Sequence, residues 1–283
     1  MAQHIGTPDP AALLQRRQAE NFPVALRVLP RRLREHLVAV YDFARVVDDL
    51  GDVDQGGDRL AKLDEFGADL ATIWAGGETR SPVLVRLAGT VHACRLPQEP
   101  FQRLVEANRQ DQKVFRYRSF EDLRRYCTLS ADPVGRIVLG IFGATTEERI
   151  ALSDQVCTGL QLVEHWQDVA EDRQAGRVYL PQEDLDRFGV SEPDLDAASA
   201  GAPLRRLLEF ETERAEALLR GGSPLVGGLR GWARLAVAGY VAGGLAAADA
   251  LRRARFDVLA GTPRPRRRDV LRHLIRLLLR GEG

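Results

Sequence analysis

Apolar residues recur every three or four positions along most of this chain, which is the spacing that gathers side chains on one face of an α-helix. Alternating apolar and polar residues, the pattern of a half-buried strand, are hard to find. The sequence therefore predicts an all-α protein. We expect its helices over residues 9–20, 31–51, 57–75, 81–94, 98–112, 119–130, 132–143, 146–173, 203–221, 228–254 and 267–280. Residues 176–203 are rich in Asp, Gly and Pro, which predicts a loop with a short helical turn near 182–187.

No internal repeat or low-complexity linker divides the chain, so we expect one domain over residues 1–283. A composition of 45% hydrophobic and 28% charged residues is typical of soluble globular proteins. The three cysteines form no CxxC pair and no metal-ligand spacing, which favours a reducing cytoplasm over a disulfide framework. The longest uncharged apolar run, residues 235–248, is shorter than the about 20 residues that span a bilayer. We therefore expect a cytoplasmic protein.

Charge is balanced over the whole chain but not along it. Forty Lys and Arg residues match forty Asp and Glu residues, which argues against a surface built for nucleic acid. The segment from Arg252 to Gly283 holds ten arginines and three carboxylates, a net charge of +7. Within it, residues 267–280 predict a basic amphipathic helix in the same domain, with leucines on one side and arginines every four residues on the other. This helix either packs on the acidic body or contacts anionic lipid on the inner face of the membrane. The sequence fixes no oligomeric state.

A polar stripe runs along the predicted helix 31–51, which is otherwise apolar over most of its circumference. Its members are spaced by 4, 3 and 4 residues and so share one face: Tyr41, Arg45, Asp48 and Asp52. Asp48 and Asp52 lie one helical turn apart, where like charges repel unless a cation lies between them. The alternative is an exposed seam in which Arg45 neutralises Asp48 and Asp49.

A second acidic stripe follows in the predicted helix 146–173, where Glu164, Asp168 and Asp172 recur every four residues beside apolar faces. If the two stripes face each other across a helical cavity, their carboxylates need a divalent cation at neutral pH. Mg²⁺ fits, because it binds through one or two carboxylates together with phosphate oxygens of a substrate. The chemistry that this predicts is ionisation of a diphosphate, with Arg45 as a bidentate donor to the leaving group.

These motifs resemble the signatures of the squalene and phytoene synthases. The resemblance rests on Asp48-Asp49-Leu50-Gly51-Asp52 after Tyr41, Phe43 and Arg45, and on Asp168-Val169-Ala170-Glu171-Asp172 before Gly176-Arg177-Val178-Tyr179-Leu180-Pro181. Tyr126-Cys127 and the stretch Ala131-Asp132-Pro133-Val134-Gly135 between them agree with it. The resemblance spans about residues 18–265. It implies the all-α isoprenoid synthase fold, a central cavity for polyprenyl chains, and Mg²⁺ held by Asp48, Asp52, Asp168 and Asp172.

The resemblance also implies roles for individual residues. We expect the four aspartates and Tyr41 to be catalytic, and five residues to bind the prenyl diphosphate substrate: Arg45, Phe22, Tyr179, Arg177 and Glu164. Glu164 departs from the family, which commonly has asparagine there. His165 beside this stripe is expected to be a packed or solvated histidine rather than a group that orients water.

Within the family, details look closest to the bacterial hydroxysqualene synthases of hopanoid pathways. They are Glu20-Asn21-Phe22-Pro23-Val24-Ala25, the helix ending Val47-Asp48-Asp49-Leu50-Gly51-Asp52, and Trp166-Gln167-Asp168-Val169, where phytoene synthases usually have Arg in place of Gln. By this resemblance the enzyme converts presqualene diphosphate and water to hydroxysqualene and diphosphate without NADPH. Two alternatives stay open: a condensing synthase that makes presqualene diphosphate, dehydrosqualene or phytoene, and a non-catalytic, membrane-associated homologue.

Overall fold

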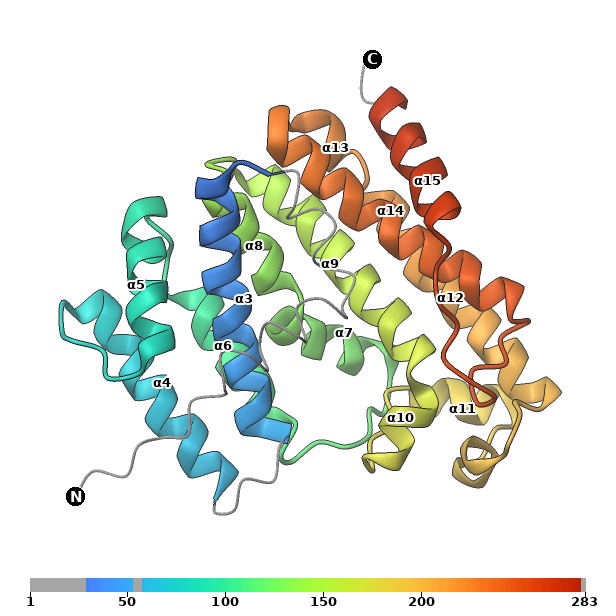
Figure 1. The fold of residues 1–283 in the computed structure, drawn as a ribbon. Helices are drawn as coiled ribbons and strands as arrows, with labels where there is room; N and C mark the ends of the chain where they lie inside the picture. The colour runs from blue at the N-terminus through green and yellow to red at the C-terminus, as the bar shows by residue number, and fades with distance from the viewer. Residues whose placement is uncertain (1–28, 53–57, 281–283) are drawn as a thin grey trace. The chain divides into compact units, whose positions relative to one another are not determined.

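The computed structural model describes residues 29–52 and 58–280, and this part of the chain is built from helices (Figure 1). The described residues contain no β-strand; a single parallel bridge pairs Arg116 with Val178. The prediction of an all-α protein is confirmed. The predicted helix 9–20 and the motif 20–25 lie outside the described residues.

The observed helices follow the predicted segments closely over most of the chain. They are α3 (Arg31–Asp52), α4 (Arg59–Ala75), α5 (Pro82–Cys94), α6 (Glu99–Gln110), α7 (Phe120–Ser130), α8 (Asp132–Ile141), α9 (Glu147–Gln167), α10 (Val169–Gln174), α11 (Gln182–Phe188), the 3₁₀ helix η1 (Glu192–Asp196), α12 (Ala202–Gly222), α13 (Leu225–Gly228), α14 (Gly231–Arg253) and α15 (Arg267–Arg280). The predicted turn near 182–187 is α11, and the segment 176–203 also contains η1.

The described part of the chain divides into two compact units. The first comprises residues 29–52, 58–113 and 136–145, and the second comprises residues 114–135 and 146–280. The expectation of one domain over residues 1–283 stays a prediction.

Polar residues at helix starts explain several boundaries. The side chains of Asp58, Ser119 and Thr146 accept hydrogen bonds from backbone N–H groups in the first turns of α4, α7 and α9. These N–H groups have no partner within their helices, so a capping side chain stabilises each start by about 1 kcal/mol. At the end of α4, Gly76 takes a left-handed conformation with φ of 74°, which costs glycine little.

In the first unit, α3 packs against α4, α5 and α6. The sequence predicts that α3 is apolar over most of its circumference. In the structure, its apolar side chains pack in an aromatic cluster that joins these helices. The Phe43 ring on α3 lies 5.4 Å from Phe101 on α6 and 6.1 Å from Phe66 on α4, and all three side chains are buried. This core fixes the helix that carries the first acidic stripe.

In the second unit, α9 packs against α12 and α14 (Figure 1). Two glycines allow a close approach of α9 and α12. A Cβ atom on Gly159 would lie 3.0 Å from the carbonyl oxygen of Ala215, and one on Gly222 would lie 2.5 Å from that of Leu152. A side chain at either position would push the helices apart, so these glycines set the position of the helix that carries the second acidic stripe.

Helices α14 and α15 pack as an antiparallel pair. Arg253 near the end of α14 pairs with Asp269 at the start of α15 at 2.6 Å, and Arg234 near the start of α14 donates to the carbonyl of Leu278. By length and composition, α14 is apolar enough to cross a membrane, but 61% of its most apolar window is buried inside the protein. One face of the basic helix therefore packs on a core helix, as the packing alternative predicts.

Candidate active site

The first acidic stripe lies at the C-terminal end of α3, where Asp48 is exposed and Asp49 is buried. Arg45 forms an ion pair with Asp49 across 2.9 Å. The alternative interpretation of the stripe predicts that Arg45 neutralises both Asp48 and Asp49, and this ion pair is the one it predicts with Asp49. Tyr41 lies half-buried one turn before Arg45. The side chain of Asp52 is outside the described residues, although its backbone ends α3.

Helix α6 and the turn that follows it hold this end of α3 through two side-chain amides. Asn108 donates to Asp48 Oδ1 at 3.1 Å, and Gln112, one turn later, donates to the carbonyl of Gly51 at 2.9 Å. A Cβ atom on Gly51 would lie 2.5 Å from Asn108 Oδ1, so the absence of a side chain at Gly51 makes room for the amide. Asn108 therefore orients the Asp48 carboxylate.

The second acidic stripe lies where α9 ends and α10 begins, which corrects the single helix predicted over 146–173. The break falls at Asp168, whose φ of −104° and ψ of 17° are not helical. Backbone hydrogen bonds with helical spacing nevertheless continue through it, from Asp168 N–H to the Glu164 carbonyl and from Asp172 N–H to the Asp168 carbonyl. These bonds preserve the four-residue spacing of the stripe.

Burial and mutual repulsion disfavour ionised carboxylates in this stripe. They raise the pKa of Asp172 to about 7, first through burial, then through Asp168, with Glu164 and Glu171 adding to it and Arg177 opposing. The pKa of Asp168 is also raised, by burial and by Glu171, against the favourable charge of Arg264. Glu164 itself is exposed. A carboxylate group with this much repulsion gains free energy from a bound cation.

A buried aromatic cluster lies beside the stripe. The ring of His165 stacks on Tyr179 with centroids 3.7 Å apart, and Tyr117 and Tyr126 complete the cluster. His165 Nδ1 lies 3.9 Å from Asp172 Oδ2, while Nε2 faces Gln161. Burial, with a contribution from Arg177, lowers the pKa of His165 to about 3, so the ring is neutral at physiological pH. His165 is thus packed, as expected, and it also touches the acidic stripe.

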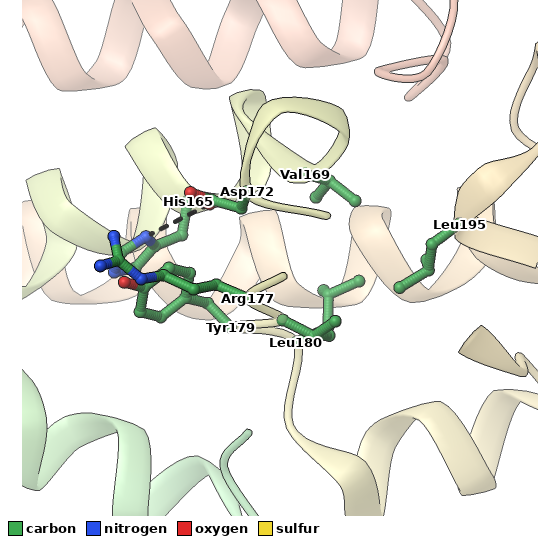
Figure 2. Close-up of a pocket in the computed structure, with 8 residues that line it drawn as sticks. His165, Val169, Asp172, Arg177, Tyr179, Leu180 and Leu195 are labelled. Carbon is green, nitrogen blue, oxygen red and sulfur yellow. Dashed lines mark ion pairs between the residues drawn. The ribbon is translucent and has the colours of Figure 1, made fainter. Parts of the chain in front are cut away.

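A small pocket opens between α10, the strand-like segment around Val178, and η1 (Figure 2). One end is polar, with His165, Asp172, Arg177 and Tyr179, and the other end is apolar, with Val169, Leu180 and Leu195 (Figure 2). Two residues expected to bind substrate, Arg177 and Tyr179, therefore lie together with one of the predicted metal ligands. A guanidinium and a carboxylate both line its polar end.

The segment that precedes α15 runs along the same stripe. The Gln167 side chain donates to the carbonyl of Pro263, and the Thr262 hydroxyl donates to Glu171 Oε1 at 3.1 Å. Arg264, the next residue along, lies close enough to Asp168 to lower its pKa against the effect of burial. We call residues 262–264 the strap.

The oxygen donors of both stripes suit a hard divalent cation. Within the described ranges, no three His, Cys, Asp or Glu side chains converge closely enough to hold a metal ion by themselves. Mg²⁺ does not require such a cage, since it retains waters and is completed by phosphate oxygens. Burial and neighbouring carboxylates raise the pKa values of Asp168 and Asp172, and a bound divalent cation would offset both effects. The donor set fits Mg²⁺.

The predicted site residues that the structure describes fall into two groups, one in each compact unit. Glu164, Asp168, Asp172, Arg177 and Tyr179 gather in the second unit, while Tyr41, Arg45 and Asp48 follow one another on α3 in the first. Phe22 lies outside the described residues. Sequence reasoning missed Asn108 and the strap, because these contacts join residues 60 or more positions apart and no spacing pattern marks them.

Comparison with known proteins places these motifs in a family. Residues 15–272 match the squalene/phytoene synthase family. A hydroxysqualene synthase of Rhodopseudomonas palustris is 36% identical over 73% of this chain and 70% of its own length. A presqualene diphosphate synthase of the same organism is 32% identical over 74% of this chain and 75% of its own length.

A crystal structure shows the same architecture. The squalene synthase HpnC from Alicyclobacillus acidocaldarius superposes with a TM-score of 0.80 at 42% identity, covering 87% of this chain and 94% of that one. This confirms the isoprenoid synthase fold that the sequence motifs imply. The chain belongs to the squalene/phytoene synthase family of isoprenoid synthases.

Proposed function

We propose that the protein is a hydroxysqualene synthase, which converts presqualene diphosphate and water to hydroxysqualene and diphosphate in squalene and hopanoid biosynthesis. The observation that carries the proposal is its 36% identity to a relative named hydroxysqualene synthase. Gln167, which stands where phytoene synthases usually have arginine, supports it.

In this reaction the bond between carbon and the diphosphate oxygen breaks, and the electron pair leaves with the diphosphate. The rearranged carbocation is captured by the oxygen of water, which then loses a proton, so no reductant is consumed. The reaction class is that of a carbon–oxygen lyase acting on a diphosphate. Mg²⁺ bound by Asp48, Asp52, Asp168 and Asp172 would neutralise the charge of the leaving diphosphate.

The residues around the second stripe have separable roles in this proposal. Arg177 provides a guanidinium at the polar end of the pocket, where it binds diphosphate oxygens. The neutral His165 ring stacks on Tyr179 and lies with Nδ1 3.9 Å from Asp172 Oδ2, so it fills the space beside that carboxylate without contributing charge. The apolar end, with Val169, Leu180 and Leu195, limits the access of water to this region.

On α3, Arg45 is a second donor to the diphosphate, and its ion pair with Asp49 holds it in position. The 2.9 Å pair joins a half-buried guanidinium to a buried carboxylate, which restricts the rotamers of Arg45. Tyr41, one turn earlier, stays a catalytic candidate on the strength of the family motif.

A second candidate is a condensing prenyltransferase. It is favoured by the relative named presqualene diphosphate synthase, whose identity of 32% is only slightly lower than that of the hydroxysqualene synthase. Such an enzyme joins two prenyl diphosphates and releases diphosphate, with the same metal and the same acidic stripes. The two candidates differ in substrate rather than in the site described above.

The experiment that separates them is a product assay with three substrates. Purified protein is incubated with Mg²⁺ and with presqualene, farnesyl or geranylgeranyl diphosphate, with and without NADPH, and the lipids are identified by mass spectrometry. We expect hydroxysqualene from presqualene diphosphate, unaffected by NADPH and abolished by EDTA. Phytoene from geranylgeranyl diphosphate as the sole product would overturn the proposal, and no turnover of any substrate by folded protein would indicate a non-catalytic homologue.

A further inference from the structure

Half of the large apolar side chains that are exposed in the described part of the chain lie on one helix. Leu271, Ile275 and Leu279 of α15 are 56%, 48% and 67% exposed and recur every four residues, so they form one row along the helix. The other exposed large apolar residues, Val85, Phe115 and Trp232, lie on or beside other helices. The sequence pattern predicts that Leu271 and Ile275 lie on the side of the helix opposite its arginines, and the structure corrects this expectation, since both are exposed.

The row cannot turn inward, because the opposite face of α15 is already engaged with α14. Asp269 is buried against Arg253, and His273 lies 2.8 Å from Asp249. These contacts fix the rotation of α15 about its axis. Leu271, Ile275 and Leu279 therefore point away from α14.

Guanidinium groups accompany the apolar row. Arg272 and Arg276 each follow a residue of the row by one position and lie along one flank, and Arg268 precedes Leu271 by about one turn. Arg272 is neutralised by Asp249 at 2.6 Å. Arg268 and Arg276 are exposed and form no ion pair with any other residue that the structure describes. The face thus combines aliphatic side chains with uncompensated positive charge.

We propose that this face of α15, made of Leu271, Ile275, Leu279, Arg268 and Arg276, docks the protein on the surface of an anionic phospholipid bilayer. Aliphatic side chains enter the boundary of the acyl chains while the flanking guanidiniums contact lipid phosphates, which is how interfacial amphipathic helices bind. The helix lies in the plane of the interface with its packed face toward α14.

A lipid surface fits this face better than a protein partner does. The row is about 12 Å long at a rise of about 1.5 Å per residue. A stable interface between two protein copies buries about 800 Å² on each side, well beyond one row of three side chains. Two like-charged faces would also repel in a symmetric dimer, because Arg268 and Arg276 of both copies would meet. This inference does not depend on the proposed reaction, since docking is measured without substrate.

The test is sedimentation of the full chain with vesicles of phosphatidylglycerol or of phosphatidylcholine, at low and at high salt. We expect pelleting with the anionic vesicles at low salt and release at high salt, because salt screens the attraction. Arg268→Glu with Arg276→Glu should lower the partition coefficient by at least about 30-fold, since each arginine near an anionic surface contributes a factor of about five. Leu271→Ser with Ile275→Ser and Leu279→Ser should lower it at both salt concentrations.

Two controls keep the test specific. Arg206→Glu with Arg230→Glu makes the same change of charge at exposed arginines outside α15 and should leave binding within about twofold. Thermal melts check that each variant is folded.

Three outcomes would overturn the proposal. They are equal pelleting with both lipids, wild-type pelleting of the Arg268→Glu, Arg276→Glu variant, and a concentration-dependent dimer that the serine variant abolishes while no vesicle is bound. The last outcome would assign the face to a second copy of the chain.

Discussion

The side-chain amide of Gln167 donates a hydrogen bond to the backbone carbonyl of Pro263, which joins the end of α9 to the segment that leads into α15. The last side chain of α9 is therefore engaged with the C-terminal segment of the same chain. Thr262 and Arg264, on either side of Pro263, contact Glu171 and influence Asp168. Gln167 thus holds the strap against the second acidic stripe.

Replacing Gln167 with alanine should release the strap while leaving the core intact. Loss of one partly buried hydrogen bond costs about 1 kcal/mol, so the melting temperature should fall by a few degrees. Gln167→Arg retains a donor that reaches a carbonyl and should melt close to the wild type. An unchanged melting temperature in the alanine variant would show that the strap is held by other contacts.

Asp48→Asn and Asp168→Asn should each lower turnover by at least about 100-fold, the scale expected for the loss of a principal electrostatic stabiliser. Asp168→Asn should retain its fold, because it removes a carboxylate that is repelled by Glu171. The independent measurement is a thermal shift on addition of Mg²⁺ and diphosphate, which should shrink in both variants. Asp186→Asn, a substitution at an exposed position on α11, should show the same thermal shift as the wild type. Wild-type rates with equal folded fractions would contradict the assignment of both stripes.

Helix boundaries in this chain were predictable because local signals set them. A capping residue marks the start of α4 and of α9, a glycine marks the end of α4, and α15 spans the predicted residues 267–280. The break at Asp168 was not predictable, because the helical hydrogen bonds and the four-residue spacing continue through it.

The acidic residues of the candidate site could be predicted from the sequence, but the hydrogen bonds that orient them could not. Carboxylates at helical spacing are visible in the sequence, whereas the hydrogen bond from Asn108 to Asp48 joins two helices across 60 positions. Likewise, the basic side of α15 followed from its spacing, but which leucines remain exposed depends on the rotation that Asp269 and His273 impose.

Two substitutions at His165 separate two roles of this residue: the space that its ring fills, and the ring nitrogen that faces Asp172. His165→Ala should destabilise the fold by about 2 to 4 kcal/mol, because it opens a cavity beside the buried ring of Tyr179. His165→Phe fills the space and should restore most of the stability. It lacks the nitrogen that lies 3.9 Å from Asp172, so we expect turnover to fall several-fold while the fold is kept. Full activity of the phenylalanine variant would reduce His165 to a packing residue.

A buried acid on α12 makes the stability of the fold depend on pH. Glu211 on α12 is fully buried, and burial together with a hydrogen bond shared with Asp184 raises its pKa to about 8, against the opposing charge of Arg214. Arg214 bonds Asp184 at 2.6 Å and lies 3.3 Å from Glu211, and its guanidinium also stacks over Phe120 and Phe210. The protonated form of Glu211 is therefore the one that the fold favours.

The sign of the effect follows from proton linkage. Since the folded pKa of Glu211 lies above that of the unfolded chain, its stabilising contribution is complete below the ordinary glutamate pKa of 4.5 and is lost as pH rises through about 8. Between these values each pH unit removes about 1.4 kcal/mol from this contribution. Glu211→Gln retains the hydrogen bond without ionising. In urea denaturation, the free energy of unfolding of the variant should therefore rise relative to that of the wild type between pH 6 and pH 9. Glu209→Gln, a substitution at an exposed position on the same helix, should show the same dependence of stability on pH as the wild type. Parallel pH profiles for Glu211→Gln and the wild type would mean that Glu211 does not carry this proton.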